Sequence, residues 1–290
     1  MTVQTHPQVT HDLRLAARQG LLPTRNSGWL AGFSNMLAKE LGEWFHTYRW
    51  LKQVLIWTTI INGFIAFLLF GLPELASIMP EIQQAQGNLF AGLPPDLGSV
   101  MMYFSIVIMT GTMGAIVLAQ DEVIQEKQSG TAAWILSKPT ARSAFILTKL
   151  LSNTIVALIF IVLLPGIITL GEISLATHHM VPLVPFLVGQ GITLLAVFFY
   201  LSLVILLGVL FEARGPVLGG VFGVMFACSI FKPFLPQIGY VFPTSMDGAA
   251  LSVVLGIPLP TMLVSQVIST AVLSILFVVV ALWHFQRIEL

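Results

Sequence analysis

The charged side chains of this 290-residue chain are concentrated in residues 120–149, which read QDEVIQEKQSGTAAWILSKPTARSAFILTK. The segment carries seven of the chain's 26 charged residues, namely Asp121, Glu122, Glu126, Lys127, Lys138, Arg142 and Lys149. Between its charged arms lies an apolar block whose Trp134, Ile135 and Leu136 would be exposed on a loop in water. Exposed apolar groups of this kind are typical of binding surfaces, so the segment predicts recognition of a partner. The alternative is that Trp134 lies back on a membrane surface, where tryptophan is enriched.

Two residues are expected to shape this segment into a hairpin. Gly130 should end the first helical arm, because glycine has no side chain and keeps more backbone freedom than other residues. Pro139 should stop the next element, since helices usually end at or before the residue that precedes a proline. Glu126 and Arg142 then lie on opposite arms, where an ion pair between them is expected to be worth less than about 1 kcal/mol if it is exposed.

Motifs for nucleotide or metal chemistry are missing from the sequence. It contains no G-x-x-x-x-G-K-[ST] phosphate loop, no H-E-x-x-H pair and no G-x-S-x-G elbow. His178 and His179 lie near Glu172, but adjacent residues on a helix do not face one another, so an external loop is expected there rather than a metal site. The single cysteine, Cys228, lies in an apolar run and predicts packing. We therefore expect no cofactor and no metal in this chain.

The composition indicates a membrane protein. Hydrophobic residues make up 56% of the chain and charged residues only 9%, whereas charged residues form about a quarter of a typical soluble domain. The net charge of zero gives no support for binding nucleic acid. Residues 1–27 are polar and lack the apolar core of a secretory signal peptide, so a mobile cytoplasmic tail is expected there.

Residues 28–50 are predicted to form one amphipathic helix in the membrane interface. An apolar and aromatic stripe recurs at spacings of three and four: Trp29, Phe33, Met36, Leu37, Leu41, Trp44, Phe45 and Tyr48. Lys39, Glu43 and Arg49 lie largely away from this stripe. A helix with one charged and one aromatic face suits the boundary between lipid and water.

Six later runs are long and apolar enough to cross a bilayer. The predicted spans cover approximately residues 53–72, 98–119, 150–171, 184–211, 216–231 and 262–284. Residues 232–261 contain five prolines, and their apolar piece is too short to cross, so a re-entrant or interfacial segment on the outer side is expected. The predicted fold is an all-α integral membrane protein in which an interfacial helix precedes six spans.

The cations are distributed very unequally between the two sides of this topology. One side receives twelve of them: Arg14, Arg18, Arg25, Lys39, Arg49, Lys52, Lys127, Lys138, Arg142, Lys149, Arg214 and Arg287. The other side receives only Lys232. Because cytoplasmic loops are enriched in Lys and Arg, we expect both termini and the 120–149 loop to face the cytoplasm.

The middles of the predicted spans hold neutral polar groups and methionines but no Asp, Glu, Lys or Arg. The candidates for lining a substrate path are Asn62, Met109, Thr112, Met113, Asn153 and Gln190. Most of the polar ones are expected to bond across helices, and the methionines to fill the core or to face a greasy substrate. Ion-coupled carriers and intramembrane enzymes, the two alternative functions, need buried ionisable groups. The composition therefore favours transport driven by another subunit.

The order of features around the charged loop resembles type-2 ABC transporter permeases. The resemblance is carried by Glu126, Gly130, Thr131, Leu136, Pro139, Arg142 and Lys149. Its broader part, an amphipathic first helix, six spans and a proline-broken outer segment before the last, covers most of residues 28–290.

This resemblance implies that the 120–149 loop carries a coupling helix that docks on a separate ATPase subunit, where ATP and Mg would bind. The docking residues are then expected to be Glu126, Gly130, Thr131, Trp134, Ile135, Leu136, Pro139 and Arg142. It also implies an exporter in the cytoplasmic membrane of a prokaryote, built from two permease copies that form a homodimer or pair with a related permease. The bilayer is the remaining expected partner.

Overall fold

The computed structural model describes residues 28–79, 81, 93–120, 122–137 and 140–287, and the regular structure in these residues is helical throughout. Six helical runs are long and apolar enough to cross a membrane, as the sequence predicts, and the protein is an all-α, multi-pass membrane protein. The expected 1–27 tail and Pro139 lie outside the described residues.

The six spans are longer than their apolar cores. They comprise α3 (Arg49–Ala66) with the π-helix η1 (Phe67–Gly71) and α4 (Leu72–Ile78); α6 (Pro95–Ala119) with α7 (Glu122–Gln128); α9 (Arg142–Ala157) with the π-helix η2 (Leu158–Leu163) and α10 (Leu164–Thr177); α11 (Leu183–Leu210); α12 (Arg214–Phe231); and α15 (Thr261–Phe285). The third span therefore begins eight residues earlier than predicted and continues past Glu172. Hydropathy marks only the apolar part of a helix, whereas the helix continues wherever its backbone bonds can form.

Helix α11 lies at the centre of the bundle. It packs against α6, α14 and α15 and, less extensively, against α9 and α12. Because its sequence is apolar on every side, it can be buried on every side, whereas α12 and α15 leave most of their surface uncovered. Around Phe199 on α11, aromatic rings from Phe242 and Phe277 pack in edge or tilted arrangements.

The predicted amphipathic helix is shorter than expected. Helix α2 covers Phe33–Phe45, and α3 begins separately at Arg49. Gly32 has φ +80°, a left-handed conformation that favours glycine, so residues 28–32 form a turn. Helix α2 turns Met36, Glu40 and Trp44 toward the protein, and the buried face therefore includes an acid that the apolar stripe did not predict.

Two short helices occupy the proline-rich segment: α13 (Ile238–Val241) and α14 (Met246–Val254). At nine residues, α14 is too short to cross a bilayer. Its apolar face is buried against α6, α11 and α15 of the same chain, and Asp247 accepts a hydrogen bond of 2.9 Å from Ser105 of α6. Contacts within the same chain are therefore sufficient to bury α14.

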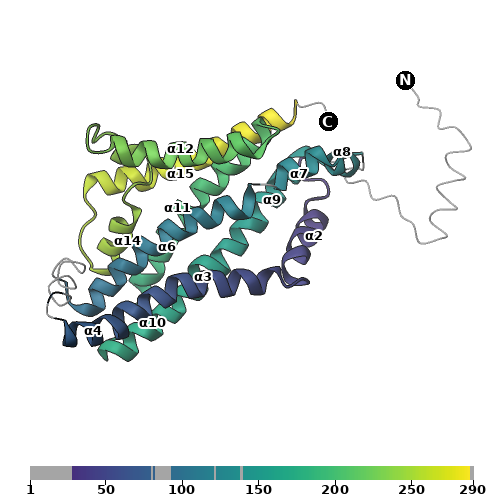
Figure 1. Cartoon of the computed structure of the whole chain (residues 1–290). Helices are drawn as coiled ribbons and strands as arrows, with labels where there is room; N and C mark the ends of the chain where they lie inside the picture. The colour runs from purple at the N-terminus through teal and green to yellow at the C-terminus, as the bar shows by residue number, and fades with distance from the viewer. Residues whose placement is uncertain (1–27, 80, 82–92, 121, 138–139, 288–290) are drawn as a thin grey trace, which may run out of the picture.

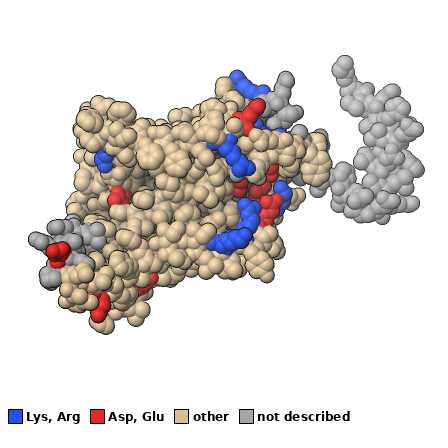
Figure 2. All heavy atoms as spheres, in the orientation of Figure 1, with Lys and Arg blue, Asp and Glu red and all other residues tan. Residues whose placement is uncertain are grey.

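Helix α2, α7 and the short helix α8 (Thr131–Leu136) lie together at one end of the bundle, opposite the end that carries α4 and α14 (Figure 1). On the face shown in Figure 2, most of the Lys and Arg side chains gather at the α2 end, which we call the basic end, and one lies toward the other end. Among the described residues this agrees with the predicted distribution, whereas Arg14, Arg18, Arg25 and Lys138 of that prediction lie outside them.

Candidate functional site

The α7–α8 hairpin projects from the basic end (Figure 1). Gly130 has φ +72°, so it makes the left-handed turn between the two helices that the sequence predicts. The Trp134 amide then bonds to the Gly130 carbonyl at 3.0 Å, and the Thr140 hydroxyl donates to the Ile135 carbonyl at 3.0 Å. Local bonds of this kind hold a six-residue helix that would not be stable alone.

The apolar block of the hairpin does not expose its side chains evenly. Trp134 is 62% exposed, whereas Ile135 is partly buried and packs against the hydrophobic core. Ile135 therefore offers less exposed surface for docking than Trp134, and the side chain of Leu136 lies outside what the structure describes. Helical periodicity explains the difference, because adjacent side chains on a helix point about 100° apart.

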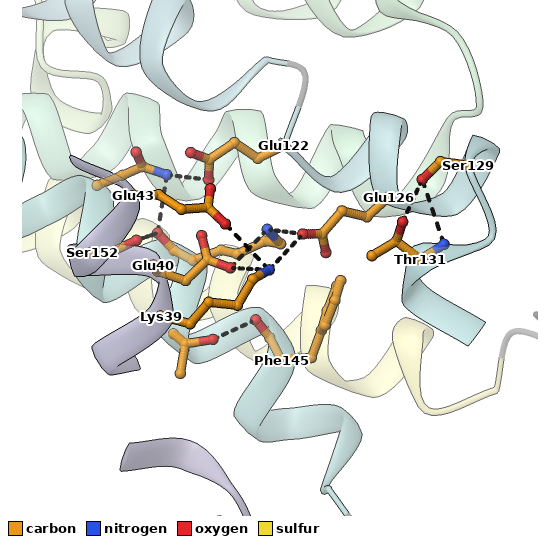
Figure 3. A network of polar contacts seen from close by, with 12 residues as sticks. Lys39, Glu40, Glu43, Glu122, Glu126, Ser129, Thr131, Phe145 and Ser152 are labelled. Atoms are coloured by element: carbon orange, nitrogen blue, oxygen red, sulfur yellow. Dashed lines mark hydrogen bonds and ion pairs between the residues drawn. The ribbon is translucent and has the colours of Figure 1, made fainter. Parts of the chain in front are cut away.

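Beneath the hairpin lies a group of buried charged and polar side chains, seen from close by in Figure 3. Lys149 of α9 is only 2% exposed, and its ammonium lies 3.1 Å from Glu126 Oε1 of α7 and 3.3 Å from Glu40 Oε1 of α2. The ion-pair partner of Glu126 is thus Lys149, with Lys39 at 3.8 Å, where the sequence suggested Arg142. One ammonium group thereby joins three helices.

Asn153 completes this group one helical turn further along α9. Its amide donates to Glu122 Oε2 at 2.6 Å and to the Lys149 carbonyl at 3.0 Å. We call Glu40, Glu122, Glu126, Lys149 and Asn153 the Lys149 cluster. Removing one member of a buried ion pair typically costs about 3–5 kcal/mol, since the other charge stays buried without its partner. The cluster is therefore a strong attachment of α2 and α7 to α9.

Two further cations attach the hairpin to distant helix ends. Lys127 Nζ donates to the Val209 and Phe211 carbonyls at 3.1 and 3.2 Å, at the C-terminus of α11. Arg142 Nη1 donates to the Phe285 and Gln286 carbonyls at 3.3 and 3.0 Å, at the C-terminus of α15. Cations are favoured at helix C-termini, whose carbonyls lack partners within the helix. Sequence reasoning missed these contacts, because backbone carbonyls carry no sequence signal.

The N-terminal turn is also pinned to the hairpin. The Ala141 amide donates to the Ala31 carbonyl at 2.9 Å, and the Ser143 hydroxyl donates to the Trp29 carbonyl. These bonds lie just before and at the start of α9, beside the point where Arg142 reaches α15. The base of the hairpin is therefore bonded to α9 and α11, and through α9 to α2 and α15, whereas Trp134 is largely exposed.

The six residues predicted to line a substrate path lie in three different places. Asn153 belongs to the Lys149 cluster. Met109 is exposed on α6, Met113 is partly buried, and the buried Thr112 donates to the Ile108 carbonyl of its own helix. Asn62 and Gln190 are buried beside η2 and α10.

The groups around η2 bond across helices. Gln190 donates to the Tyr103 hydroxyl at 2.7 Å, which donates to the Val162 carbonyl at 3.2 Å. Asn62 Nδ2 donates to the Pro165 carbonyl and to Thr169 Oγ1, both at 2.9 Å. Interhelical bonds were the outcome expected for most of these polar groups.

The expected external loop follows α10. His178 and His179 are exposed there, and His178 has φ 56° as the residue that ends the helix. Within the described ranges, no group of three or more His, Cys, Asp and Glu side chains is placed to hold a metal ion. Cys228 is buried in α12.

Comparison with known families gives one match. Residues 60–290 match the model of DUF2705, described as "Protein of unknown function". No curated protein matches the chain. The matched region begins inside α3 and contains the hairpin, Lys127, Arg142 and Lys149, whereas Glu40 of α2 lies before it.

Proposed function

The chain belongs to the DUF2705 family, and we propose that it is the membrane-spanning permease subunit of an ABC exporter driven by a separate ATPase. The observation that carries this proposal is the α7–α8 hairpin, which exposes Trp134 at the basic end on a base held by buried charges. A docking element needs an apolar contact on its outer face and a rigid attachment on its inner face. The hairpin has both.

The outer face fits what is known of protein interfaces. Tryptophan is enriched among residues that dominate binding energy, and truncating such a residue often costs about 2 kcal/mol or more. The inner face connects the hairpin to α9 through the Lys149 cluster and to α11 through Lys127, and α9 is in turn bonded to α2 through Lys149 and to α15 through Arg142. A movement of the ATPase bound at Trp134 would therefore displace α2, α9, α11 and α15 together with the hairpin, and would not only bend the hairpin.

The side of the membrane follows from the charges. Because Lys and Arg are enriched in cytoplasmic loops, we place the basic end and both termini in the cytoplasm. The ATPase, with its ATP and Mg, would then meet the hairpin from that side. We place the protein in the cytoplasmic membrane of a prokaryotic cell.

One copy with six spans supplies half of a pathway in this proposal. Two copies, each bound to one ATPase subunit, would form a closed assembly with two-fold symmetry and the path on its axis. A homodimer is the simpler form, and a pair with a related permease is the alternative.

An ion-coupled carrier is the second candidate, and one observation favours it. Glu122, Lys149 and Glu172 lie within the long helices of the second and third spans, although the sequence had suggested that the span middles hold no ionisable groups. Two of them, however, belong to the Lys149 cluster at the basic end. A carrier would transport its substrate in vesicles that contain no ATPase, which separates the two functions.

Copurification with candidate ABC ATPase subunits from the same organism tests the proposal. We expect the ATPase to be retained by the wild-type permease in detergent and Trp134→Ala to weaken retention about 30-fold, the equivalent of about 2 kcal/mol. Phe234→Ala is the control, because Phe234 is an exposed aromatic residue between α12 and α13, at the end of the bundle that carries α14. Equal retention by wild type and Trp134→Ala would remove the hairpin as the docking site.

A further inference from the structure

A second polar group lies between α3 and α10, away from the basic end. Asn62 is only 3% exposed, and its Nδ2 lies 2.9 Å from the Pro165 carbonyl, 2.9 Å from Thr169 Oγ1 and 3.4 Å from Glu172 Oε2. The other polar atom of this side chain, Oδ1, is buried and has no hydrogen-bond partner. Two N–H donors thus face three acceptors, while a strong acceptor is left unused.

The position of this group along the spans places it at membrane depth. Asn62 follows Lys52, the last charge before the first apolar run, by about 15 Å at 1.5 Å per residue. Glu172 follows Asn153 of the Lys149 cluster by about 28 Å on the same scale. Against a hydrocarbon core about 30 Å thick, the first estimate lies at the middle and the second near the outer edge, so we place the contact between them.

The Glu172 carboxylate lacks a cation. No Lys, Arg or His of the described ranges lies within 4.0 Å of it, and its one hydrogen-bond donor there is Asn62 at 3.4 Å. A carboxylate at membrane depth is costly unless a cation or a proton neutralises it, and such residues mark functional sites. The chemistry of the site thus calls for a positively charged group.

The carboxylate is reachable from the lipid-facing side of α10. Glu172 is only half-buried, and Ile167, Gly171 and Leu175 are exposed beside it at intervals of four residues. A Cβ added at Gly171, the residue before Glu172, would meet no atom within 4 Å, so this face of α10 is uncovered. A ligand could therefore lay an apolar chain along this face and bring a charged end to Glu172.

We propose that Glu172 and Asn62 form a binding site for the protonated amine of an amphipathic molecule. An ammonium group offers N–H donors to the carboxylate, which the Asn62 amide holds from the buried side, while the apolar part of the molecule rests on α10. The Asn62 amide nitrogen already bonds to the Pro165 carbonyl and to Thr169 Oγ1, so these two oxygens are not free to coordinate a small metal ion. That this molecule is also the exported substrate rests on the proposed function.

Binding to the permease alone tests the site. Purified protein in phosphatidylcholine nanodiscs is titrated with radiolabelled dodecylamine at neutral pH, and binding to empty nanodiscs is subtracted. We expect saturable binding by the wild type and at least a tenfold weaker affinity for Glu172→Gln, which keeps the size of the side chain. Glu74→Gln removes an exposed acid from α4 and should leave the affinity unchanged.

Two additional arms define the ligand chemistry. Dodecanol, with the same chain and no charge, should compete at least tenfold less well than unlabelled dodecylamine. Phosphatidylethanolamine in the nanodiscs should weaken dodecylamine binding if a lipid headgroup supplies the amine, and should have no effect if the ligand comes from another source. Glu172→Asp keeps the charge and should retain measurable dodecylamine binding. It is the variant to compare with the wild type if Glu172→Gln does not fold.

Equal affinity of folded wild type and Glu172→Gln, or equal competition by dodecanol, would overturn the amine site. Because no ATPase is present in this experiment, its failure would leave the hairpin proposal untouched. A hairpin that fails to retain the ATPase would in turn leave the binding result intact.

Discussion

The Lys149 cluster and the Asn62–Glu172 pair use the same kinds of side chain with opposite outcomes. Each contains a buried asparagine whose amide bonds to a glutamate on another helix. In the first, the Lys149 ammonium lies within 3.3 Å of two carboxylates and closes the group. In the second, the described structure offers the carboxylate an amide and no cation. The first arrangement is suited to holding helices together, and the second to receiving a charged ligand.

The difference teaches that buried charge has to be interpreted together with its partners. The Lys149 cluster has its charges on α2, α7 and α9, so these helices cannot separate without parting Lys149 from Glu40 or Glu126 in a poorly solvated place. The pair on α3 and α10 has its charge at the edge of the bundle, where Gly171 leaves open space. Three predictions test this comparison.

The largest expected effect follows from removing the central cation. Lys149→Met leaves Glu40 and Glu126 buried without their ammonium, and we expect it to destabilise the protein by about 3–5 kcal/mol. The midpoint of thermal unfolding in detergent, followed by tryptophan fluorescence, measures the change. Lys39→Met is the control, since its half-exposed pairs should contribute less than about 1 kcal/mol.

Neutralising the acids as well sharpens the same test. Combining Lys149→Met with Glu40→Gln and Glu126→Gln should recover part of the lost stability, because no uncompensated charge then remains among these three residues. A triple variant as unstable as the single one would show that packing, and not charge, holds α2 and α7 to α9.

A smaller effect is expected from the cation at the end of α11. Lys127→Met removes the donor to the Val209 and Phe211 carbonyls and should destabilise by about 1 kcal/mol. Lys127→Arg should retain most of this stability, since it keeps the charge and the N–H donors. The same unfolding measurement applies, and an equal loss in both variants would contradict the assignment as a helix-end contact.

The smallest effect is expected for Glu126 and Arg142, the ion pair that the sequence suggested across the two arms of the hairpin. A double-mutant cycle with Glu126→Gln and Arg142→Gln should give a coupling of less than about 0.5 kcal/mol, because Glu126 binds Lys149 and Arg142 binds the end of α15. The cycle with Glu126→Gln and Lys149→Met should give a clearly larger coupling. Reversed values would mean that the hairpin closes on itself.

The sequence alone determined the spans and the shape of the hairpin. Six apolar runs predicted six membrane-spanning helices, and five prolines with one short apolar piece excluded a crossing between residues 232 and 261. Gly130 predicted the turn, and Trp134 predicted an exposed aromatic side chain. These features depend on residues close together in the chain, whose hydropathy and backbone preferences act locally.

Only the tertiary structure decided which polar groups meet. It assigned Glu126 to Lys149, Lys127 to the carbonyls that end α11, and Asn62 to Glu172 more than 100 residues away. It also turned Glu40 inward on a helix whose apolar stripe had predicted only lipid-facing residues. Such pairings depend on the rotation and register of helices that pack from distant parts of the chain, and a shift of one residue turns a side chain by about 100° to another face.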